Sequence, residues 1–488
     1  MEATLQKRES FMSELYNLSP RPVWEIFDLI CSIPHPSGYE KLLAEALKSY
    51  ACQHGLVCRM DEAGNLRIDR PGAPGFEHVP GVIFQAHLDM VPLAEDENFD
   101  FVSTPVTSYI DDGSVRARGT TLGADDGAGV ALALAVLTDK ELECGPLAAV
   151  FTVNEETGLT GAAALKADML EGKYLINLDG GGCGKACIGC AGGARQEFDF
   201  IPEYDGDADG KPVWQITLSG LPGGHSGICI DLNRGNAIRS LAEFLLQFPE
   251  LQLISFDGGE ADNAIPGEAS AKVCNIPEPV SLRQAGNVFA ALLGKEHPGS
   301  APVITVTAVE SDGKIFTRER GNALLEALAL APDGVIARDE MLNIVKTSSN
   351  LAAVFTEDAQ VRIRTSQRSL DDPCREEASL LLAAHFERYG VDGKIENVYP
   401  GWKPQPDSTL VRCCAEVWKT LHGGEYRLNA VHAGLETGII GKKNPGLEMI
   451  SIGPETPGCH TPQERLSIAE MADCFEYLKQ LCKALALY

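Results

Sequence analysis

The stretch Gly81-Val82-Ile83-Phe84-Gln85-Ala86-His87-Leu88-Asp89 decides the fold class of this chain. Its first six residues form a short, largely apolar run, which is typical of a sheet strand covered on both faces. A histidine and an aspartate follow directly at the end of that run. Because ligands of open α/β sheets gather at strand ends and in the loops that follow, this arrangement predicts a functional site there.

Four further acid or histidine signals come later in the chain, and the first three of them also end an apolar run or lie in the loop after one. Together with His87 they supply two histidines and several carboxylates, a mixed nitrogen and oxygen ligand set that suits a pair of zinc-like ions. The sequence therefore predicts a two-metal hydrolase. The four signals are Gly123-Ala124-Asp125-Asp126-Gly127, Asn154-Glu155-Glu156, Asn177-Leu178-Asp179-Gly180 and Gly458-Cys459-His460-Thr461-Pro462.

The charge balance of these residues favours a catalytic metal pair. Two divalent ions bring four positive charges, and Asp125, Glu156 and Asp179 return three negative ones. A bridging hydroxide would bring the centre to zero, which a partly buried site tolerates. With one carboxylate shared, each metal keeps an open position, the mark of a catalytic rather than a structural site.

Two acids beside the expected ligands suit supporting roles. Asp89 lies two residues after His87, on the same side of an extended segment, where it could accept the second N–H of the ligand imidazole. Glu155 and Glu156 are adjacent and point opposite ways, so one can bind metal while the other acts as general base. Each acid alone could equally be a helix cap or a solvated loop carboxylate.

Composition limits the classes of partner. The chain has 488 residues, enough for two or three domains, and is 44% hydrophobic and 23% charged, as in ordinary globular proteins. A formal charge of −28 argues against nucleic acid and anionic membrane surfaces, both of which would repel it. The charge itself is explained by a solvated acidic surface.

The chain shows no targeting signal that we recognise. Residues 1–10 contain no apolar segment typical of secretion, and no stretch approaches the roughly 20 apolar residues that span a bilayer. Fifteen scattered cysteines fit a cytoplasmic protein in which most are small buried hydrophobes. The spacing Cys183-x3-Cys187-x2-Cys190 leaves an iron–sulfur or zinc cluster as a second interpretation.

The pattern of elements indicates a mostly parallel α/β domain interrupted by an inserted α+β lid domain. From about residue 20 to 190, buried strands at 81–86, 147–153 and 174–178 alternate with helices at 43–51, 128–137 and 161–170. After Gly192-Gly193 the strands become half-exposed and mix with helices, as in an antiparallel sheet. The first pattern resumes near Tyr399. We expect a first part at 1–192, an insert at 193–397 and a second part at 398–488.

The motifs resemble those of the di-zinc exopeptidase and deacylase superfamily that includes acetylornithine deacetylase and glutamate carboxypeptidase. Within it the chain is most similar to bacterial aminoacyl-histidine dipeptidases, also called cytosol non-specific dipeptidases. The matching blocks span essentially the whole chain. They are residues 81–91, 121–127, 153–158, 188–193, Gly223-Gly224-His225-Ser226-Gly227, Asn263-Ala264-Ile265-Pro266, Tyr399-Pro400-Gly401-Trp402 and residues 431–436.

The resemblance implies a role for each metal-site residue. Glu155 matches the general base and Asp89 the acid that orients His87, and the peptide bond from Asp125 to Asp126 is expected to be cis. The cofactors would be two Zn²⁺, with Mn²⁺ or Co²⁺ as substitutes. One metal would be held by His87, Asp125 and Asp179, and the second by Asp125, Glu156 and His460.

The resemblance also assigns residues of the insert. His225 would stabilise the tetrahedral oxyanion, and Asn263 and Arg368 would hold the C-terminal carboxylate of the substrate, for which the guanidinium fork is suited. Arg362 and Arg364 share the alternation of Arg368 in the strand, so either could be the inward residue instead.

Two further residues stay open. Glu436 could pair with the free amine of a substrate or be an ordinary loop carboxylate. His432 is interpreted as a packed loop histidine.

The implied function is hydrolysis of short peptides with a free N-terminus, Xaa-His dipeptides among them, by a cytoplasmic homodimer. An N-acyl amino acid deacylase or carboxypeptidase of the same superfamily is the alternative, and a non-catalytic peptide-binding protein is the alternative of another class. The chain departs from the family pattern at Asp126, where a neutral Asn is frequent, and at Gly180-Gly181-Gly182-Cys183, where acidic or Ser residues are common.

Overall fold

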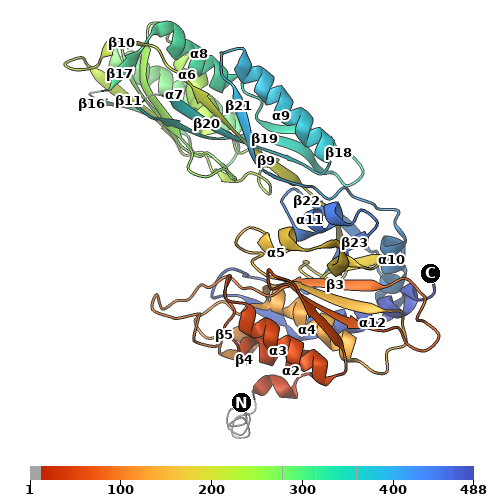
Figure 1. Cartoon of the computed structure of the whole chain (residues 1–488). Helices are drawn as coiled ribbons and strands as arrows, with labels where there is room; N and C mark the ends of the chain where they lie inside the picture. Colours follow the sequence, from red (N-terminus) through yellow and green to blue (C-terminus); the bar gives the residue numbers. More distant parts are fainter. Residues whose placement is uncertain (1–12, 277, 311–312, 359) are drawn as a thin grey trace. The chain divides into compact units, whose positions relative to one another are not determined.

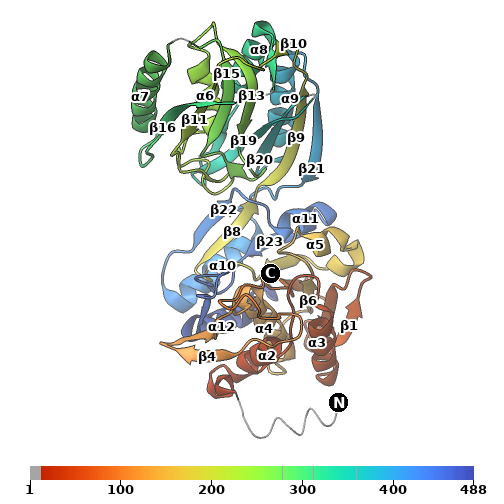
Figure 2. The same ribbon diagram turned by 90° about the vertical axis from the view of Figure 1, so that its left-hand side faces the viewer.

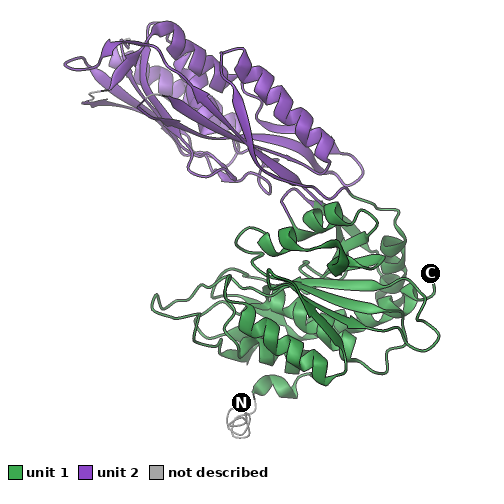
Figure 3. Cartoon of the chain, viewed as in Figure 1, with its two compact units in different colours: residues 1–189, 404–430, 435–488 green, residues 190–403, 431–434 purple. Residues whose placement is uncertain are grey.

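The computed structural model describes residues 13–276, 278–310, 313–358 and 360–488 (Figure 1). The segment 1–10, in which we find no secretion signal, lies outside the described residues. The chain forms two compact units (Figure 3). Unit 1 comprises residues 1–189, 404–430 and 435–488, and unit 2 comprises 190–403 and 431–434.

Unit 1 is built around an eight-stranded sheet (Figure 2). Strands β6, β3, β7 and β23 run parallel to one another at its centre, and β2 and β8 pair antiparallel on either side of them. The mostly parallel sheet is thus confirmed. In spatial order the strands are β1 (Val57–Met60), β2 (Leu66–Arg70), β6 (Leu147–Thr152), β3 (Val82–His87), β7 (Tyr174–Asn177), β23 (Glu448–Ser451), β8 (Lys185–Cys190) and β22 (Arg427–Val431).

Helices cover both faces of this sheet (Figure 1). Helices α2 (Arg21–Cys31), α4 (Ala124–Thr138) and α12 (Ile468–Leu485) pack together on one face, and α5 (Thr160–Ala164) and α11 (Glu436–Lys443) pack on the other. This double cover explains why every residue of β3, β6 and β7 is buried and why their sequences are apolar runs. Unit 1 also contains α3 (Lys41–Gln53) and α10 (Thr409–His422).

Two details differ from the sequence-based expectations. The helix expected over 161–170 is interrupted, since Leu165 and Lys166 are extended between α5 and a 3-10 turn at Ala167–Leu170, and the Leu165 side chain is buried. Cys183 forms a disulfide with Cys474 of α12, which removes it from the proposed cluster with Cys187 and Cys190. No local signal predicts this pair, because the two cysteines are 291 residues apart.

Unit 2 is an α+β layer built on an antiparallel sheet, as predicted for the insert. Helices α6 (Ala237–Leu245), α7 (Pro279–Glu296), α8 (Arg318–Ala329) and α9 (Asp372–Glu387) pack on the sheet, and their apolar side chains form the main core of the unit (Figure 1). Beyond the expected insert at 193–397, unit 2 includes residues 190–192, 398–403 and 431–434. Its strand order is β16 (Val303–Val309), β11 (Val213–Ser219), β15 (Ala269–Cys274), β13 (Gln252–Gly258), β19 (Ile344–Thr356), β20 (Val361–Ser369), β9 (Gly192–Phe200) and β21 (Gly393–Tyr399), with β18 (Gly334–Asp339) pairing β19.

None of the helices formed by the described residues is long and apolar enough to cross a membrane.

The glycine after Asp179 is required by close backbone packing. A Cβ atom on Gly180 would lie 2.6 to 2.7 Å from the backbone of Ile452, just beyond the end of β23. A Cβ on Gly453 would likewise overlap the carbonyl oxygen of Leu178. The segments that leave β7 and β23 approach so closely that only glycine fits, which explains the glycine at position 180.

We therefore expect Gly180→Ala to lower the free energy of unfolding by more than about 2 kcal/mol, because backbone atoms must move to admit the methyl group. Gly181→Ala is the matched control, since its Cβ would meet only the end of the Lys185 side chain at 3.8 Å. Denaturant unfolding of the two variants measures the difference. Equal stability of both would contradict this account of the packing.

Candidate metal centre

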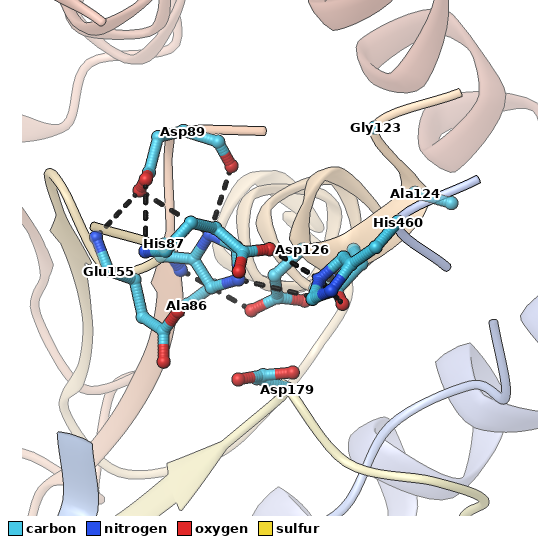
Figure 4. A network of polar contacts seen from close by, with 12 residues as sticks. Ala86, His87, Asp89, Gly123, Ala124, Asp126, Glu155, Asp179 and His460 are labelled. Atoms are coloured by element: carbon cyan, nitrogen blue, oxygen red, sulfur yellow. Dashed lines mark hydrogen bonds and ion pairs between the residues drawn. The ribbon is translucent and has the colours of Figure 1, made fainter. Parts of the chain in front are cut away.

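Four of the five expected metal ligands, His87, Asp125, Glu156 and His460, converge at the carboxyl edge of the parallel sheet. Figure 4 labels the two histidines and the fifth expected ligand, Asp179. His87 ends β3, and its Nε2 lies 3.2 Å from Oδ1 of Asp125. His460 Nε2 lies 3.3 Å from the other oxygen of Asp125 and 2.8 Å from Oε1 of Glu156. Asp125 therefore stands between the two histidines, the position expected of a bridging ligand.

The tautomer of His87 indicates what its second nitrogen binds. Nδ1 lies 3.0 Å from the carbonyl oxygen of Asp89, which can only accept, so Nδ1 carries the proton. In the neutral ring Nε2 then presents a lone pair toward the carboxylate of Asp125. Two acceptors at 3.2 Å repel unless a cation or a proton lies with them. A metal ion at this position would satisfy both.

The pKa values of the site report a local excess of negative charge. Burial opposes charging of His87, but its hydrogen bond to Asp125 and the surrounding acids leave its pKa raised well above the ordinary value. The hydrogen bond to Asp125 raises the pKa of His460 to about 9. Burial and the charge of Asp125 raise the pKa of Asp179 well above its ordinary value. The carboxylates of the site therefore carry more negative charge than the neighbouring positive groups of the protein neutralise.

The donor atoms fit a pair of divalent cations. One ligand atom each from His87, Asp125 and Glu156 lies within 4.8 Å of the others, and so do those of Asp125, Cys459 and His460. Asp179 follows β7 and lies at the same site in Figure 4, although it belongs to neither of these two groups. Cys459 is an additional neighbour that the sequence analysis did not single out. Among the described residues, neither group includes Cys187 or Cys190.

Asp89 is buried behind the ligands, but it contacts more than His87. Its carboxylate Oδ1 is 3.6 Å from His87 Nδ1, beyond hydrogen-bond distance, and the backbone carbonyl accepts that proton instead. The carboxylate accepts the backbone N–H groups of Glu155 at 2.9 Å and Glu156 at 3.1 Å, and the hydroxyl of Ser37. Asp89 therefore holds the segment that carries Glu155 as well as the loop that orients His87.

Glu155 and Asp126 are two further acidic residues of the site. Burial raises the pKa of Glu155 to about 7, a value suited to accepting and returning a proton near neutral pH. The bond between Asp125 and Asp126 is cis, as expected. Asp126 is buried and accepts the backbone N–H groups of His87 at 3.3 Å and Gly129 at 3.1 Å. It thus connects β3 to the start of the regular part of α4.

Glu464 is a buried supporting residue that the sequence analysis missed. Its carboxylate accepts four backbone N–H groups of the loop that carries Asp125, those of Leu122, Gly123, Ala124 and Asp125, at 2.7 to 3.1 Å. Since Glu464 follows His460 by only four residues, it joins the two loops that carry these ligands. In the sequence, the one feature that could have indicated Glu464 is its position four residues after the expected ligand His460.

The adjacent strands β6, β3 and β7 each carry a buried polar side chain two or three residues before the site residue at the strand end. Asn177 donates to Gln85 Oε1 at 2.7 Å, and Gln85 donates to Thr152 at 3.2 Å. Gln85 and Thr152 both donate to Oε2 of Glu436, at 2.6 and 2.8 Å. The other oxygen of Glu436 is buried without a hydrogen-bond partner, and burial together with the charge of Glu155 raises the pKa of Glu436 to about 8.

In unit 2, His225 is held as a neutral donor. It lies on the short strand β12 (Gly224–His225), which pairs with β14 (Ala264–Ile265). Its Nδ1 accepts the backbone N–H groups of Gly227 and Ile228, both at 3.1 Å, so the proton of the neutral ring is on Nε2. Burial and the charge of Arg368 lower its pKa, which keeps the ring uncharged.

Asn263 and Arg368 line one pocket of about 280 Å³ in unit 2, together with Arg195, Asp262 and Tyr399. In the described part of the chain Arg368 forms no ion pair with an acid. By contrast, Arg362 pairs with Glu197, Asp199 and Glu357, and Arg364 with Glu197 and Asp262. Of the three arginines that the alternation left open, Arg368 is the one with an unneutralised charge beside Asn263.

His432 is a packed histidine in the segment 431–434. It is buried, and its Nε2 lies 2.7 Å from the hydroxyl of Ser348. Burial and the charge of Arg368 lower its pKa to about 4.

Two histidines and several carboxylates around a shared aspartate, with a buried glutamate beside them, define a metal-dependent hydrolase. Residues 83–484 match the peptidase family M20/M25/M40, and the chain belongs to this family and is a metallopeptidase. It is 36% identical over 484 residues to the cytosol non-specific dipeptidase of Escherichia coli strain K12, covering 97% of this chain and 99% of that protein.

The chain is also similar in structure to solved proteins. The chain is similar to aminoacylhistidine dipeptidase from Vibrio alginolyticus, with a TM-score of 0.89, 37% identity and coverage of 97% and 98% of the two chains. Aminopeptidase PepT from Bacillus cereus shares the fold, with a TM-score of 0.57 at 17% identity, covering 96% of this chain and 99% of that one.

We expect Glu464→Gln to weaken metal binding by about 10- to 100-fold, because an amide replaces one of two accepting oxygens and two of the four N–H groups lose their partner. Glu448→Gln is the control, since Glu448 accepts a backbone N–H of Leu410 in the same unit. Zinc titration of the metal-free proteins in the presence of a competing chelator measures the affinities. Equal zinc affinity of Glu464→Gln and wild type would show that the hydrogen bonds of Glu464 do not organise the metal ligands.

Proposed function

We propose that the protein is a cytoplasmic, homodimeric di-zinc dipeptidase that hydrolyses short peptides with a free N-terminus, Xaa-His dipeptides among them. The observation that carries the proposal is the convergence of His87, Asp125, Glu156 and His460 beside the buried Glu155. The names of the two relatives at 36% and 37% identity, each matched over 97% of this chain, support the substrate class. Zinc fits the mixed imidazole and carboxylate donors, and Mn²⁺ or Co²⁺ would suit the same set.

The proposed ligands are His87, Asp125 and Asp179 for one ion and Asp125, Glu156 and His460 for the other. When bound, the ions would polarise the scissile carbonyl and lower the pKa of the attacking water. Glu155 takes the proton from that water and returns it to the nitrogen of the leaving amine.

His225 donates its Nε2–H to the oxygen of the attacked carbonyl, where negative charge develops. Asn263 and Arg368 bind the C-terminal carboxylate of the peptide.

Glu436 supports the free-amine requirement. One of its carboxylate oxygens is buried without a partner, and among the described residues it forms no ion pair with a lysine or arginine. A substrate ammonium group would supply both the missing donor and the missing positive charge. An N-acyl group would supply no charge, which favours a dipeptidase over a deacylase.

Glu155→Gln should reduce kcat by about 10²- to 10⁴-fold, because the amide cannot accept the proton of the attacking water. The bound zinc should be unchanged, since Glu155 is not a proposed ligand. Turnover of Ala-His and elemental analysis of the purified protein test both statements. Glu141→Gln, an exposed substitution in the same unit, is the control. Unchanged turnover in Glu155→Gln would disprove the base assignment.

Zinc-loaded protein should hydrolyse Ala-His with a kcat/KM at least about 100-fold above that for N-acetyl-Ala-His, because acetylation removes the charge that pairs with Glu436. A coupled assay of released histidine measures both substrates. The reverse preference would indicate a deacylase or carboxypeptidase. Binding of both peptides without cleavage of either would indicate a non-catalytic peptide-binding protein.

A further inference from the structure

The phenol of Tyr399, at the end of β21, contacts the guanidinium of Arg368. The Tyr399 hydroxyl accepts a hydrogen bond from Arg368 Nη1 at 2.8 Å. Both side chains line the pocket of about 280 Å³ that also contains Asn263. All three residues belong to unit 2, so this contact is a property of that unit alone.

The ring of Tyr399 is fixed from two sides. A Cβ atom on Gly193 would lie 2.5 Å from the ring carbon Cζ, and one on Gly434 would lie 2.9 Å from Cε2. The backbone is held as well, because the carbonyl of Tyr399 accepts from Arg375 Nη1 at 2.9 Å, and Arg375 pairs with Asp372 at 2.7 Å. Two glycines thus leave space for the ring, and the hydroxyl has a defined place.

The charge of Arg368 remains available for a ligand. A guanidinium has five N–H donors, and within the described residues hydrogen bonds to Tyr399 and Ser226 use two of them. An acid in the place of Tyr399 would neutralise the guanidinium and compete with an anionic ligand. A phenol oxygen orients the guanidinium and leaves its positive charge unpaired, whereas the nearby Arg195 is paired with Asp262, Glu197 and Glu396.

We propose that Tyr399 is the residue that positions Arg368 to receive the C-terminal carboxylate of the peptide substrate. The inference rests on the proposed dipeptidase function and adds a determinant of specificity to it. Tyr399 acts through Arg368: its hydroxyl holds one edge of the guanidinium, so that the remaining N–H groups can form paired hydrogen bonds with a carboxylate. A substrate without that carboxylate gains nothing from the contact.

Binding to an inactive background tests this without turnover. Isothermal titration calorimetry would compare zinc-loaded Glu155→Gln with Glu155→Gln/Tyr399→Phe, using Ala-His and its C-terminal carboxamide. We expect Tyr399→Phe to weaken binding of Ala-His about tenfold and to leave that of the carboxamide within about twofold, because only the carboxylate uses the oriented guanidinium. In the active protein the same change should raise KM for Ala-His and leave kcat within about twofold.

Two further variants separate positioning from a general effect on the unit. Tyr389→Phe changes a tyrosine of unit 2 outside the pocket and should alter the affinity for neither ligand. In an Arg368→Met background, Tyr399→Phe should cost no further affinity, since the group through which it acts is gone. A loss in that background equal to the loss in its absence would overturn the proposal.

Other outcomes are equally distinct. If Tyr399→Phe weakens binding of acid and carboxamide alike, Tyr399 only supports the shape of the pocket and the inference is wrong. If wild-type protein cleaves Ala-His and Tyr399→Phe retains both Kd and KM, the inference falls and the dipeptidase function stands. If wild-type, zinc-loaded protein cleaves no dipeptide, the proposed function itself is wrong and the inference falls with it.

Discussion

The candidate metal site depends on the hydrogen bonds that the carboxylate of Glu464 accepts. This carboxylate accepts four consecutive backbone N–H groups from a loop some 340 residues earlier in the chain, and that loop presents Asp125 between His87 and His460. A buried carboxylate is costly unless hydrogen bonds satisfy it, and here the donors are backbone groups that cannot swing away. Asp125 and the distant His460 are therefore held in register by the protein itself.

The parallel sheet supplies the second half of the same arrangement. Because β6, β3 and β7 are adjacent and point the same way, the residues that follow them, Glu155, His87 and Asp179, emerge at one edge. Beneath them Thr152, Gln85 and Asn177 form a hydrogen-bonded row across the same three strands. Burying polar side chains in strand interiors is costly unless they form hydrogen bonds, and the hydrogen bonds of this row fix the relative register of the strands. The hydrogen bonds among these three side chains thus fix where the strands end and, with that, where the acids that follow them lie.

Much of this was predictable, and the reasons differ from residue to residue. The apolar runs ending in His87, Glu155 and Asp179 are local signals, so the sheet and the edge at which these residues gather follow from sequence alone. The signal at residues 458–462 already indicated His460. Motif resemblance supplied His225, Asn263 and Arg368, and the structure places Asn263 and Arg368 in one pocket.

Sequence analysis did not single out Glu464 and quoted Tyr399 only as part of a motif, because the contacts of both residues are tertiary. Glu464 accepts backbone N–H groups from a distant loop, and Tyr399 accepts a hydrogen bond from the guanidinium of Arg368. The disulfide between Cys183 and Cys474 has the same character. The helix expected over 161–170 failed for another reason, since burial of Leu165 outweighs local helix propensity.

The chain enters unit 2 twice, and this restricts how the protein can be divided or recombined. The four residues 431–434 return to unit 2 long after its main body has ended at residue 403, and they carry His432, the partner of Ser348, and Gly434, which borders the ring of Tyr399. Cutting out residues 190–403 as a transplantable module would leave that fragment without part of its own interior. An exchange of this unit between relatives would have to carry the short return segment along, so the two stretches are expected to be inherited together.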